Sequence, residues 1–404
     1  MWLLGFFLHE MAFGLLSVFV PLYITGTIVG GTLVDVGIMT SLATFSSIPF
    51  FFIWGFLCDK TKHYKLFILI SFSSITALLY VFALTTNITL LIFLFAIIAV
   101  VHVAHVPPKS VLVAESFSRP DWEKAFASYE LLTKIGWSIG LFLGFLSSSQ
   151  GFSSTSILLL CSLLNLAAFL TSAIFVSDPI LVFERGLARI ERTMNFTQNG
   201  ITFALKALEG QIIKDKFKSE NPSAFCAGLI LFSFATSLLI TPLPIFFSRD
   251  MALASSFVFA MFMMDSGGSC IGYFFAISKT QQHDGKGSLK RIALVRSLLA
   301  LLLIPGILYV SIFTVLSAAA IMVVMGFAYA FFIIYTLSTS MELLPQGKTG
   351  LFNVLVGFGQ ATGCLIGPLI AANYGFLYVF IVAGTIFIFS SLAFKIFSVS
   401  PVTT

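Results

Sequence analysis

Long apolar runs separated by short polar segments follow one another along most of the chain. Each run approaches the roughly 20 residues that a helix needs to cross about 30 Å of hydrocarbon. Backbone groups in lipid must find their hydrogen-bond partners internally, and no alternating strand pattern is visible, so we predict helices. The twelve predicted spans cover approximately residues 2–24, 36–58, 66–85, 89–112, 125–147, 155–177, 222–247, 254–277, 292–310, 312–337, 350–372 and 375–397.

The composition supports this prediction. Of 404 residues, 58% are hydrophobic and only 10% are charged, whereas about 25% of the residues in ordinary soluble domains are charged. No soluble fold of this size has an interior large enough to bury so much apolar surface. We therefore expect an all-α membrane protein in which lipid surrounds most side chains.

The basic residues predict an orientation. The connections after every second span, together with the end of the last span, contain 19 of the 22 lysines and arginines. The connections on the other side contain one, Arg249. Because positively charged connections remain in the cytoplasm, we predict that both termini are cytoplasmic. The basic residues are scattered between apolar runs, so we expect no nucleic-acid partner.

The sequence contains no recognisable cofactor site. Its five cysteines have no paired spacing, so we expect neither a disulfide framework nor a cysteine metal site. Gly347-Lys348-Thr349 is similar to part of a phosphate loop, but Glu342 replaces the required glycine and no strand precedes it. We therefore expect no cofactor and no use of ATP. The sequence has no clustered set of catalytic residues, so we do not expect an enzyme.

The longest polar connection, residues 178–221, divides the chain into two blocks of six spans, 1–177 and 222–404. Its apolar residues recur at helical spacing between charged ones: Phe183, Leu187, Ile190 and Met194. This spacing predicts an amphipathic helix on the membrane surface. The alternative function for the segment is a simple tether between the two blocks.

The two blocks are similar where their fifth spans begin. A shift of 227 residues places Glu115 on Glu342, and it superposes a stripe of small residues: Gly136, Gly140 and Gly144 on Gly363, Gly367 and Ala371. A small residue at every fourth position lets two helix backbones approach closely. Matching stripes in two blocks suggest an internal duplication, as is common in secondary transporters.

Two motifs resemble those of the major facilitator superfamily. The segment after the second span contains Gly55, Asp59 and Lys60, which match its signature G-x-x-x-D-[RK]-x-G-[RK]-[RK], while Lys62 replaces the second glycine. In span 11, Gly363, Gly367 and Pro368 are similar to the motif G-x-x-x-G-P-x-x-G-G of antiporter branches. Span 5 has leucine in place of that proline, so the resemblance leaves the subfamily unassigned.

The resemblance implies a fold and a mechanism. Two pseudo-symmetric six-helix bundles would alternate in exposing a central cavity lined by spans 1, 4, 7 and 10. It also implies that Asp59 acts as part of a cytoplasmic gate against the start of span 11. We consider Lys109, at the end of span 4, a candidate partner of Asp59. The alternative is a loop that only anchors the topology.

Charged residues within the spans indicate where the chemistry lies, because each is costly in lipid unless it is paired or hydrated. Glu10 and Ser17 share one face of span 1, and His102, His105 and Lys109 share one face of span 4. Burial favours the neutral form of a carboxylic acid, and histidine titrates near physiological pH. We therefore predict Glu10, with His9, His102 and His105, as proton-coupling candidates.

Two alternatives remain open for this group. Glu10 is a structural partner of His9, His102 or Lys109 in the first alternative. In the second, His102 and His105 bind a transition metal, but no third ligand is evident in the sequence. The prediction therefore includes no metal.

Further polar residues are candidates for the solute cavity. Glu130 and Lys134 have the spacing of a helical ion pair, although Lys134 is also able to bind an anion. Asp265 marks a polar break in span 8 and contacts either the solute or a neighbouring helix. Arg296 lies one turn inside span 9 and is expected to extend to the lipid headgroups. The hydroxyl candidates are Ser17, Ser237, Thr241, Tyr329 and Tyr335.

We expect a proton-coupled secondary transporter that exports a small amphipathic or drug-like solute. Uptake of a sugar, an amino acid or an organic anion is the alternative within this class. A receptor or sensor is the alternative outside it, although receptors usually have a larger soluble domain. The expected partners are a small-molecule solute, protons and membrane lipid. We expect a monomer that crosses the plasma membrane several times.

Overall fold

The structure is a computed structural model that describes residues 2–116, 122–178, 222–279, 285–343 and 349–398. Within this part of the chain, twelve helices are long and apolar enough to cross a membrane, and they coincide with the twelve predicted spans. The described residues form no β-strand. The all-helical class predicted from the apolar runs is therefore confirmed. The predicted amphipathic helix at 183–194 lies outside the described residues.

The first six spans are formed by α1 (Leu3–Ile24), α2 (Leu33–Thr61), α3 (Tyr64–Ala83), α4 (Ile88–His102) with η1 (Val103–His105) and α5 (Val106–Ser116), α6 (Trp122–Ser149) and α7 (Ser154–Phe175). The other six are formed by α10 (Pro222–Ile240) with α11 (Leu243–Ile245) and the π-helical turn η3 (Phe246–Asp250), α12 (Ser255–Lys279), α13 (Gly285–Leu301) with α14 (Pro305–Leu308), α15 (Ile312–Leu343), α16 (Thr349–Tyr374) and α17 (Phe376–Ser398).

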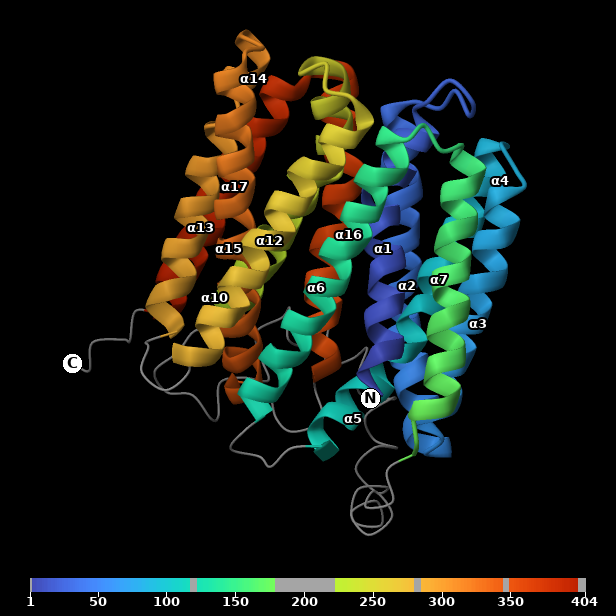
Figure 1. Cartoon of the computed structure of the whole chain (residues 1–404). Helices are drawn as coiled ribbons and strands as arrows, with labels where there is room; N and C mark the ends of the chain where they lie inside the picture. Colours follow the sequence, from blue (N-terminus) through green and yellow to red (C-terminus); the bar gives the residue numbers. More distant parts are fainter. Residues whose placement is uncertain (1, 117–121, 179–221, 280–284, 344–348, 399–404) are drawn as a thin grey trace, which may run out of the picture.

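Local chemistry explains why some spans differ from their predicted limits. The second span begins at Leu33, three residues earlier than predicted, because Thr32 and Asp35 form a capping box that satisfies the first free N–H groups. The seventh span is interrupted near Pro242 and Pro244, which cannot donate backbone hydrogen bonds. Both features lie at the end of the molecule opposite the chain termini (Figure 1).

The helices of each half pack in the same pattern. In the first half α1 packs against α6 and α7, α2 against α4, and α3 against α7. In the second half α10 packs against α16 and α17, α12 against α15, and α13 against α17. The halves meet mainly through α2 with α16 and α6 with α12. The two halves lie side by side in Figure 1, with α6 and α16 between them.

Glycines bring the first and fifth helices of each half into backbone contact. A Cβ on Gly136 or Gly140 of α6 would collide with the carbonyl of Phe7 or Met11 in α1. A Cβ on Gly363 or Gly367 of α16 would collide with the carbonyl of Phe234 or Leu238 in α10. The 227-residue shift relates both the glycines and the carbonyls that they face. The two halves therefore repeat one contact, residue for residue.

Other small residues bring the two halves together. Gly144 of α6 faces the ring of Phe259 in α12, where a Cβ would collide with it. A Cβ on Gly37 of α2 would lie 3.1 Å from Pro368 of α16. The Arg249 guanidinium, in η3 at the end of the seventh span, donates to the carbonyl of Thr25 at 3.1 Å. We call the end of the molecule where α1 begins and α17 ends the terminal end; these contacts tie the halves together toward the opposite, far end.

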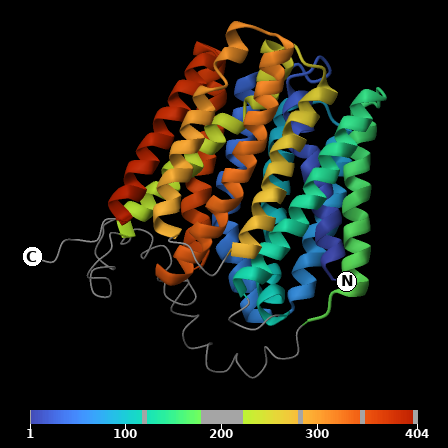
Figure 2. The ribbon, with the colours of Figure 1, turned by 60° about the vertical axis from the view of Figure 1, so that its left-hand side comes forward.

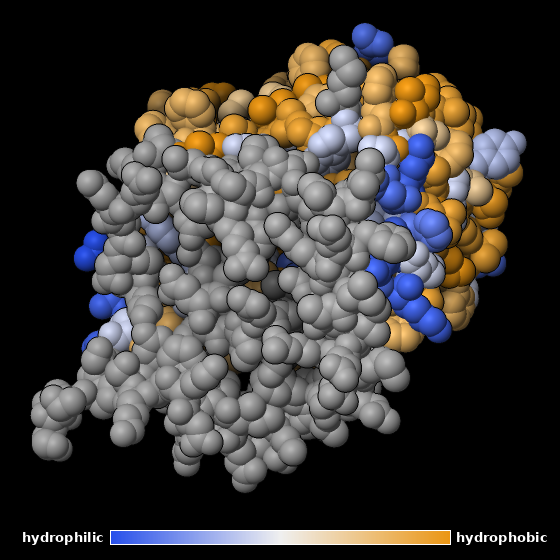
Figure 3. Space-filling view, turned by 90° about the horizontal axis from the view of Figure 1, so that it is seen from below, coloured by the Kyte–Doolittle hydropathy of each residue, from blue (hydrophilic) through white to orange (hydrophobic). Residues whose placement is uncertain are grey.

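Basic residues of the described chain gather at the terminal end. Lys60 ends α2, Lys65 begins α3, and Lys395 lies in the last turn of α17. Figures 1 and 2 show both chain ends on this side of the molecule. Seen from this end, hydrophobic residues dominate the upper and right-hand parts of the view, and the largest visible group of hydrophilic residues lies to the right of the centre (Figure 3). This distribution suits a protein whose sides contact lipid.

The loop after α2 contains an unusual backbone conformation. Lys62 terminates α2 in the left-handed region with φ +57°. This is the position at which the motif resembled by residues 55–65 has glycine. A side chain in this region costs about 1–2 kcal/mol, which glycine avoids because it has no Cβ. The chain therefore keeps the backbone of the motif without its favoured residue.

Replacing Lys62 tests this conformation. Lys62→Gly and Lys62→Ala both remove the side chain, but only alanine retains the strain. We expect the glycine variant to be more stable than the alanine variant by about 1 kcal/mol, measured as the difference in thermal unfolding in detergent. Equal stability of the two variants would show that the left-handed conformation is absent in solution.

Replacing a glycine of the α1–α6 contact tests the packing. Gly140→Ala places a methyl group against the Met11 carbonyl, so we expect a loss of about 1–3 kcal/mol of stability through overpacking. Gly55→Ala is the matched control, because nothing lies within 4 Å of a Cβ built there. Thermal unfolding of both variants in detergent measures the difference. A control variant as unstable as Gly140→Ala would contradict the packing argument.

Candidate functional site

The fourth span changes its helix type beside two histidines. Pro107 and Pro108 lack the N–H groups that would bond to the carbonyls four residues earlier. The chain tightens into η1 between α4 and α5. The hydroxyl of Ser71 in α3 donates to the carbonyl of His102 at 3.3 Å. The prolines thus set the geometry in which His102 and His105 stand.

Three histidines meet inside the first half. His9 of α1 lies with its Nε2 atom 3.1 Å from Nδ1 of His102. The ring of His105 lies 4.8 Å from those of both His9 and His102, measured between ring centroids. His9 is 0% and His105 2% exposed, whereas His102 is half-buried. Aromatic rings of Phe6, Phe13 and Phe72 surround the three.

The position of these histidines differs from the prediction in two ways. We expected His9, His102 and His105 to face a central cavity beside Glu10, but His9 and His105 are buried within the first half. The reason is that a helix turns by about 100° per residue, so His9 and Glu10 point in different directions. We also expected no third metal ligand, and His9 now stands beside the other two.

Sequence reasoning missed two polar partners of the histidines. Nδ1 of His9 lies 2.7 Å from Oδ1 of Asn165 in α7. Ser71 Oγ lies 3.5 Å from Nδ1 of His105. Both residues are fully buried, at 0% exposure. A buried asparagine in an apolar span was the one available signal, because such a residue needs a polar partner.

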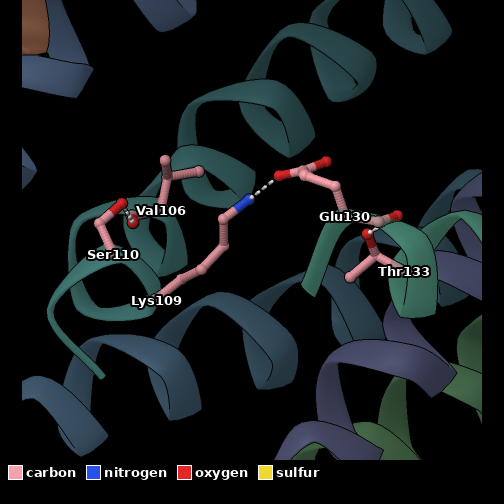
Figure 4. A network of polar contacts seen from close by, with 5 residues as sticks. All are labelled: Val106, Lys109, Ser110, Glu130 and Thr133. Carbon is pink, nitrogen blue, oxygen red and sulfur yellow. Dashed lines mark hydrogen bonds and ion pairs between the residues drawn. The ribbon is translucent and has the colours of Figure 1, made fainter. Parts of the chain in front are cut away.

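Lys109 forms the ion pair of this region. Its Nζ atom lies 3.3 Å from a carboxylate oxygen of Glu130 in α6 (Figure 4). The same ammonium group lies 4.6 Å from the ring centroid of Tyr129. The predicted pair of Glu130 with Lys134 is therefore replaced by one between α5 and α6. The reason is that Lys109 approaches Glu130 from a neighbouring helix, whereas Lys134 lies over the ring of Trp137 at 5.0 Å.

A second group of charges lies where the two halves meet. Lys134 of α6 and Asp265 of α12 are half-buried and close enough for their charges to interact. Beside them the Ser138 hydroxyl donates to the Ser266 hydroxyl across the same pair of helices at 2.7 Å. Asp265 also interacts electrostatically with Arg296. Asp265 thus interacts electrostatically with a cation of each half.

Glu10 belongs to this group of charges. It is half-buried, and its charge interacts with those of Lys109, Glu130 and Lys134. Within the described part of the chain its carboxylate forms no hydrogen bond. Glu10 therefore interacts with charged residues of α5 and α6. Its neighbour His9 is instead buried beside His102. We call Glu10, Lys109, Glu130, Lys134 and Asp265 the interface charge cluster.

We expected Arg296 to extend to the lipid headgroups, but it is buried inside the second half. It is 2% exposed, and its guanidinium lies 5.3–5.4 Å from the ring centroids of Phe232, Tyr329 and Phe387. Its Nε atom is buried and has no hydrogen-bond partner among the described residues. The guanidinium turns inward because the faces of three aromatic rings attract the cation. Tyr329, a predicted cavity residue, is therefore occupied with Arg296.

The remaining hydroxyl candidates fall into two sets. Ser17 donates to the carbonyl of Gly14 at 2.7 Å, and Thr241 donates to Cys364 at 3.3 Å. These two hydroxyls serve the packing of their own halves. Ser237 and Tyr335 are half-buried. They are not brought into the interface charge cluster by any contact in the described residues.

The residues of the signature motif lie at the terminal end of α2. Asp59 and Lys60 occupy its last turn, and Lys60 lies 5.8 Å from the ring centroid of Phe56. The helix that α2 contacts in the other half is α16. Lys109, the candidate partner of Asp59, is paired with Glu130 in this conformation.

Solved structures of transporters are similar to the whole chain. The nucleoside transporter NupG has a TM-score of 0.69 and 13% identity over 98% of this chain and 97% of that chain. The human organic anion transporter MFSD10 (TETRAN) has a TM-score of 0.69 and 16% identity over 97% of each chain. A POT family transporter in complex with 5-aminolevulinic acid has a TM-score of 0.72 and 13% identity, over 98% of this chain and 95% of that chain. At these identities the likeness shows the fold.

Sequence comparison supplies the family. No curated protein sequence matches the chain. The model of the Major Facilitator Superfamily matches residues 2–353, well over half of the chain. The family match agrees with the twelve membrane-spanning helices and with the fold of the similar transporters. The chain therefore belongs to the major facilitator superfamily of membrane transporters.

Proposed function

We propose that this protein is a proton-coupled secondary transporter that moves a small solute by alternating access. The observation that carries the proposal is the interface charge cluster. It holds carboxylates and ammonium groups within spans, and Lys134 and Asp265 belong to α6 and α12, which join the two halves. Charges in such positions are costly, and in membrane proteins they mark ion and substrate pathways.

The arrangement of the halves supports alternating access. The halves repeat the same packing and meet mainly through two pairs of helices, so each half is able to move as a body. The distribution of basic residues supports a cytoplasmic terminal end. The far end, where Arg249 bonds to Thr25, then faces outward. In the proposed cycle, the present conformation is closed toward the outside.

Protons are the proposed coupling ion because carboxylates of the cluster lie between cations. Asp265 interacts with Lys134 in the other half and with Arg296 in its own. Protonation of Asp265 removes its attraction to Lys134 and so weakens the link between the halves. A proton then shifts the balance between conformations through its different affinity for each. Glu10 and Glu130 belong to the same cluster.

The solute is proposed to bind beside this cluster. Export of an amphipathic or drug-like compound is supported by aromatic surface beside the charges, above all Trp137. A small organic anion or zwitterion is the second candidate, taken up or exported. Lys134 favours it, because this ammonium group has no carboxylate within 4 Å among the described residues. Similar structures include an organic anion transporter and a transporter bound to 5-aminolevulinic acid.

The proposal also includes a cytoplasmic gate and a monomeric protein. Gly55, Asp59 and Lys60 form the gate between α2 and the start of α16 at the cytoplasmic side. No atom lies within 4 Å of a Cβ built on Gly55. We therefore propose that α16 has room to approach α2 more closely when the gate closes. The protein acts as a monomer in the plasma membrane, since each chain contains both halves.

Transport by reconstituted protein tests the function. The purified protein is first screened for thermal stabilisation by nucleosides, peptides, organic anions and amphipathic drugs. Stabilising compounds are then assayed in proteoliposomes under an imposed pH gradient. We expect solute flux that depends on the gradient, with proton movement reported by a pH-sensitive dye. Vesicles that move neither solute nor protons across the whole panel would overturn the proposal.

Asp265→Asn tests the coupling role. We expect at least about a tenfold loss of gradient-driven flux, while solute exchange without a gradient is retained, because the neutral amide imitates the protonated acid in both conformations. Asp35→Asn is the matched control, since Asp35 lies at the far end as the N3 residue of the α2 capping box, where the amide oxygen of asparagine is also able to accept the Thr32 N–H. Gradient-driven flux equal to that of the control would exclude Asp265 as a proton carrier.

A further inference from the structure

The histidine cluster has the composition and spacing of a metal site. Ligand atoms of His9, His102 and His105 all lie within 4.8 Å of one another. They come from α1 and from the α4–η1 junction. Imidazole nitrogen is a preferred ligand of zinc, copper and nickel. The proposed transport function does not use these three side chains.

Hydrogen bonding fixes the protonation of His9. The amide nitrogen of Asn165 donates to the Cys161 carbonyl at 2.9 Å, so its Oδ1 atom faces His9. Nδ1 of His9 must therefore carry the proton that bonds to this oxygen. Its Nε2 atom is left with a lone pair directed at His102. Metal-binding histidines are typically oriented in this way by an oxygen acceptor on their other nitrogen.

Ser71 acts in the same way on His105. The Ser71 hydroxyl donates its proton to the His102 carbonyl, so its oxygen is able to accept from Nδ1 of His105 at 3.5 Å. This leaves Nε2 of His105 with a lone pair. His102, which is half-buried, can offer either nitrogen by changing tautomer.

The spacing requires only a small adjustment to bind an ion. Metal–imidazole distances of about 2.0–2.1 Å place ligand nitrogens roughly 3.4 Å apart. His9 and His102 are already 3.1 Å apart. The largest separation, 4.8 Å, has to shorten by an amount on the order of 1 Å, which side-chain rotation supplies.

The surroundings favour a singly charged ion. The three ligands are neutral, their shell is aromatic, and the positive charge of Lys109 acts on all three. The charge of Glu130, paired with Lys109, offsets part of this repulsion. The cost of burying an ion rises with the square of its charge, so a divalent ion costs about four times as much as a monovalent one. Cuprous ion is able to bind three nitrogen ligands alone, whereas zinc held by three histidines takes a water molecule as its fourth ligand.

We propose that His9, His102 and His105 bind one cuprous ion inside the first half of the protein. Asn165 and Ser71 orient the ligands. The bound ion links α1 to the fourth span and so stiffens the first half. The three ligands lie inside the first half, whereas Glu10 on the same helix α1 belongs to the interface charge cluster; Lys109 is a member of that cluster whose charge also reaches the ligands.

Metal binding by the full-length protein tests this proposal. Protein without a histidine tag is titrated anaerobically with Cu⁺ against a colorimetric Cu⁺ chelator. We expect one equivalent bound, and a loss of affinity of at least about tenfold in each of His9→Gln, His102→Gln and His105→Gln. Asn165→Leu is expected to weaken binding by about 10–100-fold, as for other residues that orient a ligand. His63→Gln is the matched control, because this side chain is 69% exposed.

Stability provides a second readout that is separate from transport. Cu⁺ is expected to raise the unfolding temperature of the wild type and of His63→Gln, but not that of the three ligand variants. Each variant is first compared with the wild type without metal, and any that does not fold is replaced by the matching asparagine substitution. X-ray absorption is expected to show nitrogen ligands at about 2.0 Å.

Three results would overturn the proposal. Cu⁺ binding that persists in all three ligand variants would belong to the five cysteine thiols. Tighter binding of Zn²⁺ or Co²⁺ than of Cu⁺ would contradict the charge argument. Failure to bind any of the three ions would show that the histidines form only a buried hydrogen-bonded network.

Discussion

Direct backbone contact between the first and fifth helices of each half is the constraint on which the rest of the structure depends. In the first half it sets α1 against α6 at Gly136 and Gly140. Because no side chains separate these backbones, Glu10 on α1 lies within electrostatic range of Glu130 and Lys134 on α6. A wider spacing between the two helices would weaken the electrostatic interaction of Glu10 with Glu130 and Lys134, on which the proposed transport depends.

The same contact separates two kinds of chemistry. His9 and Glu10 are neighbours in the chain, but the turn of the helix directs His9 into the first half and Glu10 toward α6. The carboxylates therefore lie where two moving bodies meet, and the histidines lie inside one of them. A group at the interface experiences a change of surroundings when the halves move. A group within one half keeps its partners, which suits a permanent site better than a transient one.

The halves repeat their backbone packing but not their polar groups. The 227-residue shift that superposes the glycine contacts places Glu10 on Ser237 and His102 on Tyr329. The second half instead buries Arg296 among three aromatic rings. Packing constrains small residues strongly, because a Cβ at those glycines meets a backbone carbonyl. Polar positions face fewer steric limits, and each half has acquired its own set.

The sequence by itself determined the twelve helices, because apolar runs of that length have no other stable form in lipid. It also determined the repeated glycine contacts and the family motifs, which depend on local spacing. Only the tertiary structure decided which polar groups meet. His9 meets His102, 93 positions further along the chain. Lys109 pairs with Glu130 in place of Lys134, and Arg296 turns inward. Such partners depend on the rotation of each helix about its axis, which packing between distant segments sets and local sequence does not.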